Sequence, residues 1–402
     1  MHNSSIESLQ SEPLFTRDFN LLMLAHFMQA LGFSSMLLLP LYLDFLDASR
    51  AEIGSVMAAA AIGGLCARPG IAWALDRWGR KKTLATGTLI LGSSMTLILL
   101  VDHVGGIAYS MRVLFGIGAG ACFSGYFTFA ADLIPESRRT EGLALFGVTG
   151  LVPLLVNPLS ELLVTNPAEL QWFLPCVGGA VLCSIIPLMN VRENRGDSQH
   201  KPWRVREVLQ SLRSMPLMPV WFVTFVFSGL VAVFFSFTTV TAQDRGIESP
   251  THIWYMYALG AAVIRISGAK MLDKIGPSNL VAPALACYVG SVLAAASAEF
   301  YPGILLAGSL AGLGHGICFP ILTSQVVGRT PEHHRGSAMA MFTAIWSLSG
   351  LLMPPLFGAI ADRYDDTLMF LLAAMWATIA LGGWAALEHR LAAPRPAIAQ
   401  ET

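Results

Sequence analysis

The charged hairpin at residues 68–84 reads RPGIAWALDRWGRKKTL, and it lies directly between two long apolar segments. Shifted by 197 residues, a similar pattern returns at residues 265–276 as RISGAKMLDKIG. The matched positions pair Arg68 with Arg265, Ala72 with Ala269, Leu75 with Leu272, Asp76 with Asp273, Gly79 with Gly276, and Arg77 with Lys274. This is an internal duplication, and repeated membrane halves are typical of secondary transporters.

The duplication extends beyond the hairpin. With an offset of 196, two further runs match: Gly116, Gly118, Gly120, Cys122 and Phe123 with Gly312, Gly314, Gly316, Cys318 and Phe319, and Pro135, Glu136, Arg139, Ala144 and Phe146 with Pro331, Glu332, Arg335, Ala340 and Phe342. The glycine spacing favours close packing of neighbouring helices. No Gly-x-x-x-x-Gly-Lys-Ser/Thr sequence occurs, so ATP-driven transport by this chain alone is disfavoured.

The composition is that of a membrane protein. Hydrophobic residues make up 54% of the chain and charged residues 13%, against about 25% charged in an ordinary soluble domain. The net charge of −1 argues against a nucleic-acid partner. All six cysteines lie in apolar segments, which favours buried small hydrophobes over a disulfide framework or a metal site. We expect no cofactor and no bound metal.

Twelve apolar segments are long enough to cross the hydrocarbon core. They run approximately over 19–43, 51–75, 83–101, 107–131, 142–164, 170–190, 217–240, 253–272, 278–298, 302–327, 338–360 and 368–387. The predicted fold is therefore an all-α membrane protein with two pseudo-symmetric six-helix bundles. The predicted organisation is a tail at 1–18, bundles at 19–190 and 217–387 joined by a linker at 191–216, and a second tail at 388–402.

Lysine and arginine are unevenly shared between the two sides of the predicted bundle. The side that carries the tails and the linker receives most of them, and the opposite face receives Arg50, Arg245 and Arg363. Because positively charged loops are retained in the cytoplasm, both termini are predicted to be cytoplasmic. The N-terminal stretch to Arg17 is polar and does not resemble a signal peptide.

These residues resemble the major facilitator superfamily over nearly the whole chain. Its loop pattern Gly-x-x-x-Asp-Arg/Lys-x-Gly-Arg-Arg/Lys is matched by Asp76, Arg77, Gly79, Arg80 and Lys81, with Ala72 in place of the first glycine. Arg68-Pro69 is similar to the drug and arabinose-efflux branch, which includes siderophore and metallophore exporters. Arg112 and Gly116 resemble the second motif of the superfamily. Proton antiporters carry Gly-Pro in the fifth helix, where this chain has Asn157-Pro158.

The charged hairpin has two interpretations. It can be a conformational latch, because contacts made by Asp76 and its neighbours exist only while the cytoplasmic ends are together. It can also be a topology anchor under the positive-inside rule. The duplicated Asp and Gly favour the latch, whose residues are Asp76, Arg77, Gly79, Arg80, Asp273, Lys274 and Gly276.

Three arginines fall inside the predicted membrane segments, where a charge is costly and marks a functional candidate. For Arg112 we favour a cavity position that attracts an anionic substrate, with pairing to backbone carbonyls as the alternative. Arg68 and Arg265 occupy matched positions about two turns from the charged loops, so snorkelling and a structural role are favoured for both.

A proton-coupled carrier needs a titrating group. Glu161 is the best candidate if it faces the cavity, since burial raises the pKa of a carboxyl group toward neutrality. Asp132 is the second option, although capping of the loop after it is the simpler role. His26 and Gln29 share one helix face and can bind substrate or make an ordinary interhelical hydrogen bond. His315 poses the same choice, and the His333-His334 pair lies in a loop.

Two classes of function remain. The leading prediction is an inner-membrane secondary transporter, a monomer working by alternating access, that couples protons to efflux of a small organic solute such as a drug, sugar or siderophore-like compound. The alternatives are a symporter importing a sugar or organic acid, and a non-transporting receptor or scaffold. No sequence motif of a membrane enzyme is present, so the chain is not predicted to be an enzyme.

Overall fold

The computed structural model describes residues 13–135, 138–193, 215–267, 277–331 and 334–392, and these ranges are built from helices and short turns. The helices of the first half are α2 (Arg17–Ser35), η2 (Met36–Leu38), α3 (Leu39–Phe45), α4 (Arg50–Arg77), α5 (Arg80–Thr96), η3 (Leu97–Leu100), α6 (Gly106–Leu133), α7 (Arg139–Val148), η5 (Val152–Leu155), α8 (Val156–Ser160), η6 (Pro167–Glu169), α9 (Leu170–Cys183) and α10 (Ile185–Met189). The second half contains η7 (Met215–Leu217), α12 (Met218–Asp244), η8 (Pro250–His252), α13 (Ile253–Ser267), α15 (Pro277–Ser297), α16 (Tyr301–Gly328), α17 (Arg335–Arg363) and α18 (Asp366–Ala392).

Ten helical segments in the described ranges are long and apolar enough to cross a membrane. The predicted segment at 142–164 is not one continuous helix, because it is divided into α7, η5 and α8. Pro153 and Pro158 lie in this segment, and a proline lacks the N–H that continues a helix. The predicted segment at 253–272 is represented by α13, which ends at Ser267 where the described range ends.

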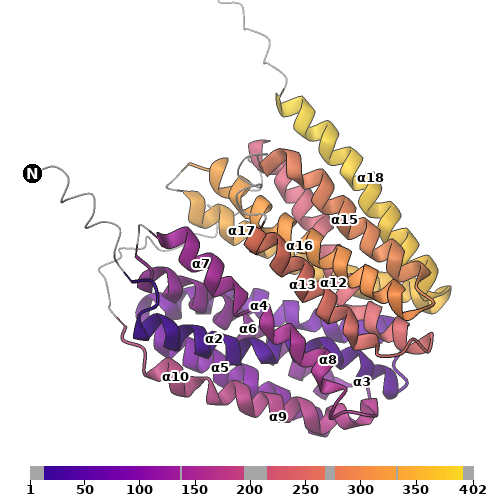
Figure 1. The fold of residues 1–402 in the computed structure, drawn as a ribbon, viewed down its shortest axis with the longest axis horizontal. Coiled ribbons are helices and arrows are strands. Elements are labelled where there is room, and N and C mark those ends of the chain that lie inside the picture. Colours follow the sequence, from indigo (N-terminus) through magenta and orange to yellow (C-terminus); the bar gives the residue numbers. More distant parts are fainter. Residues whose placement is uncertain (1–12, 136–137, 194–214, 268–276, 332–333, 393–402) are drawn as a thin grey trace, which may run out of the picture.

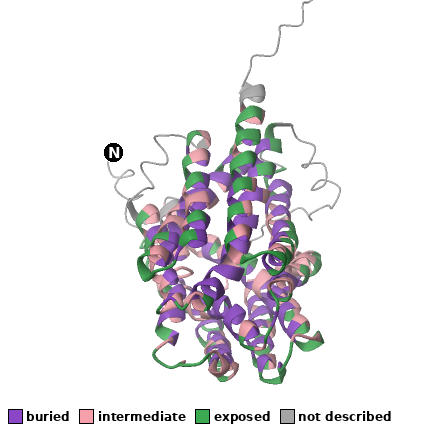
Figure 2. Cartoon of the chain, turned by 90° about the vertical axis from the view of Figure 1, so that its right-hand side faces the viewer, coloured by how far each residue is buried: buried purple, intermediate pink, exposed green. Residues whose placement is uncertain are grey.

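The two halves form two groups of roughly parallel helices (Figure 1). Exposed residues lie mainly on the outer faces of the helices and buried residues between them (Figure 2). Many of the exposed side chains are large and apolar, including Leu162 at 79% and Ile379 at 67% exposure. This distribution suits a molecule whose outer faces contact lipid rather than water.

Glycines allow duplicated close contacts within each half. A Cβ at Gly116 of α6 would collide with the carbonyl of Ala60 in α4, and a Cβ at Gly312 of α16 would collide with the carbonyl of Tyr257 in α13. The predicted packing role of these glycines is thus visible in the backbone geometry, because no side chain fits between the paired helices.

Two seams join the halves, one where α4 packs on α17 and one where α13 packs on η5 and α8. We call the end of the molecule that bears residues 76–80, 189–193, 329–331 and 334–335 the linker end. The opposite end, which bears residues 44–50, 161–170, 244–252 and 362–366, is the distal end. The two groups of helices converge toward the distal end and diverge toward the linker end (Figure 1).

Candidate functional site

Arg112 lies about one and a half turns into α6 from its distal end and is 5% exposed. One Nη donates a hydrogen bond to the carbonyl oxygen of Met57 in α4 at 3.1 Å, and the guanidinium carbon is 5.1 Å from the centre of the Phe115 ring. Its Nε and its other Nη have no partner among the described residues. A buried guanidinium with free donors can bind an anion without first breaking a strong pair.

Arg68 and Arg265 occupy matched positions and each reaches across a seam to the other half. Arg68 in α4 donates to the hydroxyl of Thr343, to the carbonyl of Thr343 at 2.9 Å and to the hydroxyl of Ser347 at 2.9 Å. Arg265 in α13 donates to the carbonyl of Gly147 in α7 at 3.4 Å. Gly147 and Thr343 are themselves related by the offset of 196, so the two arginines make pseudo-symmetric contacts.

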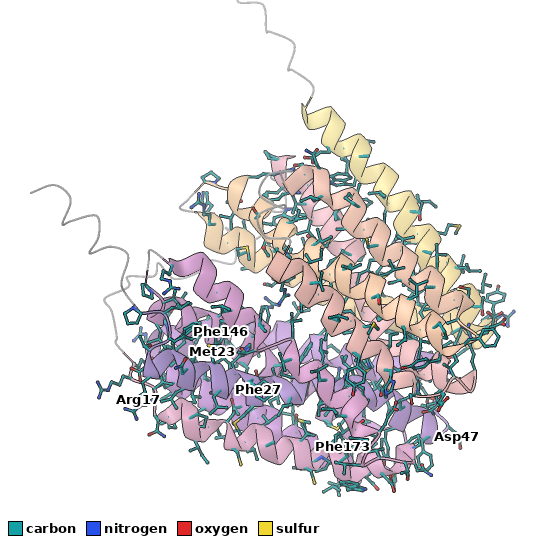
Figure 3. All side chains as sticks on the ribbon, viewed as in Figure 1. Arg17, Met23, Phe27, Asp47, Phe146 and Phe173 are labelled. Atoms are coloured by element: carbon teal, nitrogen blue, oxygen red, sulfur yellow. The ribbon has the colours of Figure 1, made fainter. Side chains whose placement is uncertain are left out.

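His26 lies in α2 within an aromatic group. Its ring stacks on Phe146 with the ring centres 4.5 Å apart, and Nδ1 is 2.6 Å from the hydroxyl of Thr149. Figure 3 shows Phe146 of α7 close to Met23, which lies in α2 as His26 does. Gln29 is buried one turn further along α2. The hydrogen bond between His26 and Thr149 joins α2 to the residue that caps α7, and is the interhelical bond that one interpretation of His26 predicts. A substrate role for His26 and Gln29 stays a prediction.

His315 lies in α16 and is surrounded by rings of the second half. It shares a hydrogen bond with the hydroxyl of Tyr257, and its ring centre is 5.6 Å from that of Phe227 and 5.9 Å from that of Trp346. Arg265 is close enough to interact electrostatically with both Tyr257 and His315. A cationic group, a histidine and aromatic faces are therefore grouped on one wall of the second half.

Glu161 follows α8 at the distal end, where it bridges the halves. Its carboxylate accepts hydrogen bonds from the backbone N–H of Thr251 at 3.1 Å and from the hydroxyl of Thr251 at 2.5 Å. The other carboxylate oxygen is 3.6 Å from Nε2 of His252. Glu161 also lines a pocket of about 280 Å³ between the halves, together with Leu38 and Ser249. The role of Glu161 in proton coupling stays a prediction.

Arg50 is not among the predicted site residues, yet it contacts more acidic side chains than any other described arginine does. Its guanidinium pairs with Asp44 at 2.6 Å, with Asp366 at 3.2 Å and with Asp244, and its backbone N–H donates to Asp362 at 2.6 Å. The Arg50 side chain is 11% exposed. Three of these four carboxylates belong to the second half, so Arg50 ties the halves together at the distal end.

At the linker end the described ion pairs stay within one half. Arg80 pairs with Asp132 at 3.1 Å and donates to the carbonyl of Leu75, and Arg329 pairs with Glu388. Gly79 has a φ of 88°, which favours glycine, at the start of α5.

In the predicted latch, Asp76 and Arg77 are exposed. Asp273, Lys274 and Gly276 lie outside the described residues. His333 is also outside the described ranges.

Two residues with buried side-chain amides were also not among the predicted site residues. Asn157 is fully buried and Gln325 is 4% exposed, and the side-chain oxygen and nitrogen of both have no hydrogen-bond partner in the described part of the chain. An unpaired buried amide is costly. The only sequence signal was the position of Asn157 before Pro158.

Comparison with known proteins agrees with this architecture. The Major Facilitator Superfamily profile matches residues 22–354, so the chain belongs to that family. It is a multi-pass integral membrane protein and a secondary transporter of a small molecule, not an enzyme.

Relatives cover nearly the whole chain. An uncharacterized MFS-type transporter of Salmonella typhimurium is 25% identical over 375 residues, which cover 89% of this chain and 91% of that protein. Multidrug resistance protein 1 of Bacillus subtilis is 22% identical over 363 residues, which cover 87% of this chain and 91% of that protein. Among solved structures, a mutant of the nucleoside transporter NupG superposes with a TM-score of 0.80 at 12% identity, covering 92% of this chain and all of that one.

Proposed function

We propose that this protein exports an amphipathic organic anion across the bacterial inner membrane in exchange for protons. The observation that carries the substrate class is the set of three arginines within the membrane-spanning helices. In the described part of the chain, Arg68, Arg112 and Arg265 donate only to carbonyl and hydroxyl oxygens. None of the ion pairs described for this chain includes them.

A charged side chain inside a membrane is costly when no group of opposite charge pairs with it. Insertion scales assign an arginine at the centre of a helix a cost of about 2.5–3.5 kcal/mol. A carboxylate, sulfonate or phosphonate on the substrate would supply the missing negative charge and bind the planar guanidinium of Arg112 in a bidentate way. This favours an anionic solute over a neutral sugar.

The wall around His315 supports an apolar part in the same solute. His315, Phe319 and Trp346 are half-buried rings that pack on one another, and Phe227 and Tyr257 are buried beside them. Aromatic side chains supply a large apolar contact area, and a nearby cation selects the charged end of the molecule. The name of the Bacillus relative also favours efflux of organic compounds.

The positive-inside rule supports placing the linker end in the cytoplasm. In that orientation the distal end is closed by the contacts of Arg50 and Glu161, and the described state faces inward. For proton coupling we propose Glu161, with His26 and Asp132 as the other titrating candidates. The Glu161 bridge exists only while the distal end is closed, so a proton on this carboxylate would couple to the change of state.

Arg112 provides the decisive experiment. Arg112→Ala should abolish binding of an organic carboxylate to the purified protein, and Arg112→Lys should weaken it strongly, because lysine keeps the charge but loses the planar fork. Melting temperatures are measured on the same samples. Arg363→Ala, at an exposed arginine of the distal end, is the matched control and should bind as the wild type does.

Solute and direction are tested in proteoliposomes with an imposed pH gradient. The carboxylate should move against the proton flux, while its neutral amide analogue should not be transported. Unchanged binding by Arg112→Ala with a lower melting temperature would show that the arginine is only structural. Movement of solute and protons in the same direction would favour the symporter.

A further inference from the structure

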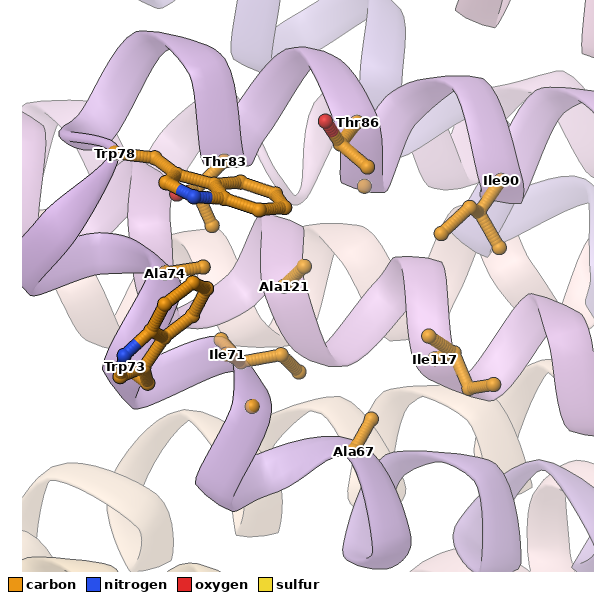
Figure 4. Close-up of a pocket in the computed structure, with 12 residues that line it drawn as sticks. Ala67, Ile71, Trp73, Ala74, Trp78, Thr83, Thr86, Ile90, Ile117 and Ala121 are labelled. Carbon is orange, nitrogen blue, oxygen red and sulfur yellow. The ribbon is translucent and has the colours of Figure 1, made fainter.

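A groove on the outer surface of the first half contains none of the candidate site residues described above. Helices α4 and α5 form its walls and α6 forms its floor (Figure 4). Its volume is about 330 Å³. The lining is apolar except for Thr83 and Thr86.

Small residues keep the groove open. A Cβ at Gly70 would meet nothing within 4 Å. Three of the duplicated positions in the second half carry larger residues, since Ala67 is matched by Ile264, Thr83 by Leu280 and Ala121 by Ile317. Leu280 and Ile317 are buried there. At these three positions the first half therefore leaves room that larger side chains occupy in the second half.

The length of the groove matches one leaflet. Between Ala67 and Trp78, α4 rises about 16 Å at 1.5 Å per residue, and half of the hydrocarbon core is about 15 Å thick. Trp73 and Trp78, with ring centres 5.4 Å apart, stand at the end of the groove near the linker end (Figure 4). Tryptophan is typical of the membrane–water interface, so the groove runs from that interface toward the bilayer centre.

Charged side chains surround the interfacial end. Arg77 and Lys82 are exposed and directly adjoin the lining residues Trp78 and Thr83. Asp76 is also exposed at this end and reduces the local positive charge. Lys81 contributes a further cation, although its Nζ donates to the carbonyl of Met189 at 2.7 Å. The net charge at the interfacial end of the groove is therefore positive, which favours an anionic headgroup.

We propose that this groove binds one acyl chain of an anionic glycerophospholipid from the leaflet at the linker end, with its headgroup at Arg77 and Lys82. The apolar lining and leaflet-long shape select an acyl chain, and the cations select the charge of the headgroup. This site is independent of the proposed substrate and of the direction of transport.

Native mass spectrometry of the full chain tests the site with phosphatidylglycerol and phosphatidylcholine that carry the same acyl chains. The wild type should hold one phosphatidylglycerol in preference to phosphatidylcholine. Gly70→Phe places a ring in the open space and should remove this tight lipid, since each methylene displaced costs about fourfold in affinity. Gly179→Phe is the matched control, because a Cβ at Gly179 of α9 also meets nothing within 4 Å, and it should bind as the wild type does.

The headgroup is tested separately. Lys82→Gln should weaken phosphatidylglycerol by about fivefold, the effect of one cation near an anionic surface, and leave phosphatidylcholine unchanged. A phosphatidylglycerol with a diazirine in its acyl chain should label peptides from residues 67–90 in the wild type, which needs no variant to fold. Labelling elsewhere, equal binding of the two lipids, or full binding by Gly70→Phe would each overturn the proposal.

Discussion

The two ends of the molecule use charged residues differently. At the distal end, Arg50 and Glu161 of the first half bind residues of the second half, so the charges tie the halves together. At the linker end, the described pairs Arg80–Asp132 and Arg329–Glu388 each remain within one half. The same kind of interaction therefore favours one conformational state at one end and only the stability of a half at the other.

This contrast locates the free energy that alternating access must redistribute. A ligand or proton shifts such an equilibrium only through contacts that differ between the states. The contacts of Arg50 and Glu161 are of this kind, whereas the Arg329–Glu388 pair would persist in both states because its half moves as a unit. Substitutions at the two ends should consequently have different signatures.

The largest effect is expected at Arg50. Arg50→Gln removes its ion pairs with Asp244 and Asp366, and hydrogen bonds to charged groups contribute about 1.5–3 kcal/mol each. Allowing for the 46% exposure of Asp244, we expect a shift toward the distal-open state of about 100-fold, or about 3 kcal/mol. Spin labels at residues 103 and 300 on distal loops, in a cysteine-free background, should then report longer distances by electron paramagnetic resonance.

Arg245 is the matched control for this change. Its guanidinium donates to the carbonyls of Ala295, Ala296 and Ala298, all within its own half. Arg245→Gln should lower the melting temperature without changing the label distances. If Arg50→Gln leaves the distance distribution unchanged, the distal end is not held closed by this residue.

A smaller effect on the same equilibrium is expected for Glu161→Gln. The amide keeps an acceptor oxygen for Thr251 but loses the negative charge beside His252, so the shift should be about tenfold, or about 1.4 kcal/mol. Proton-driven transport should stop while substrate binding survives. Glu169→Gln is the control, because that carboxylate bonds only to its own loop at Thr165 and Asn166. Full dependence on the pH gradient in Glu161→Gln would point instead to His26 or Asp132.

At the linker end, Asp76→Asn should slow transport several-fold and favour the inward-facing state. The expected cause is loss of a charge-assisted contact that forms only when that end closes. In the described state Asp76 is exposed, so its removal should hardly change the melting temperature. Turnover is measured in proteoliposomes, with Asp76→Glu as the charge-preserving comparison. Equal turnover of Asp76→Asn and wild type would leave only the topology-anchor role.

How far the sequence predicted these features depends on the range of the interactions. The apolar segments, the duplication and the matched arginines are local patterns, and the helical fold of two bundles was predicted from them. The breaks at Pro153 and Pro158 could have been predicted from the same local chemistry. The cluster at Arg50 could not, because Asp366 lies 316 residues away along the chain and only the packing of α4 against α17 brings it close.

The finest comparison is between the two duplicated arginines. Arg68→Lys loses most of three hydrogen bonds to Thr343 and Ser347, whereas Arg265→Lys loses one bond of 3.4 Å to Gly147. At about 1 kcal/mol per bond, Arg68→Lys should lower the melting temperature more than Arg265→Lys does. Binding of the organic carboxylate should show the opposite order, because Arg265 is within electrostatic range of Tyr257 and His315. The two arginines lie in different seams and share no described partner, so their effects on stability should add in the double variant. A larger loss of stability in Arg265→Lys would mean that the two contacts are not used as the structure indicates.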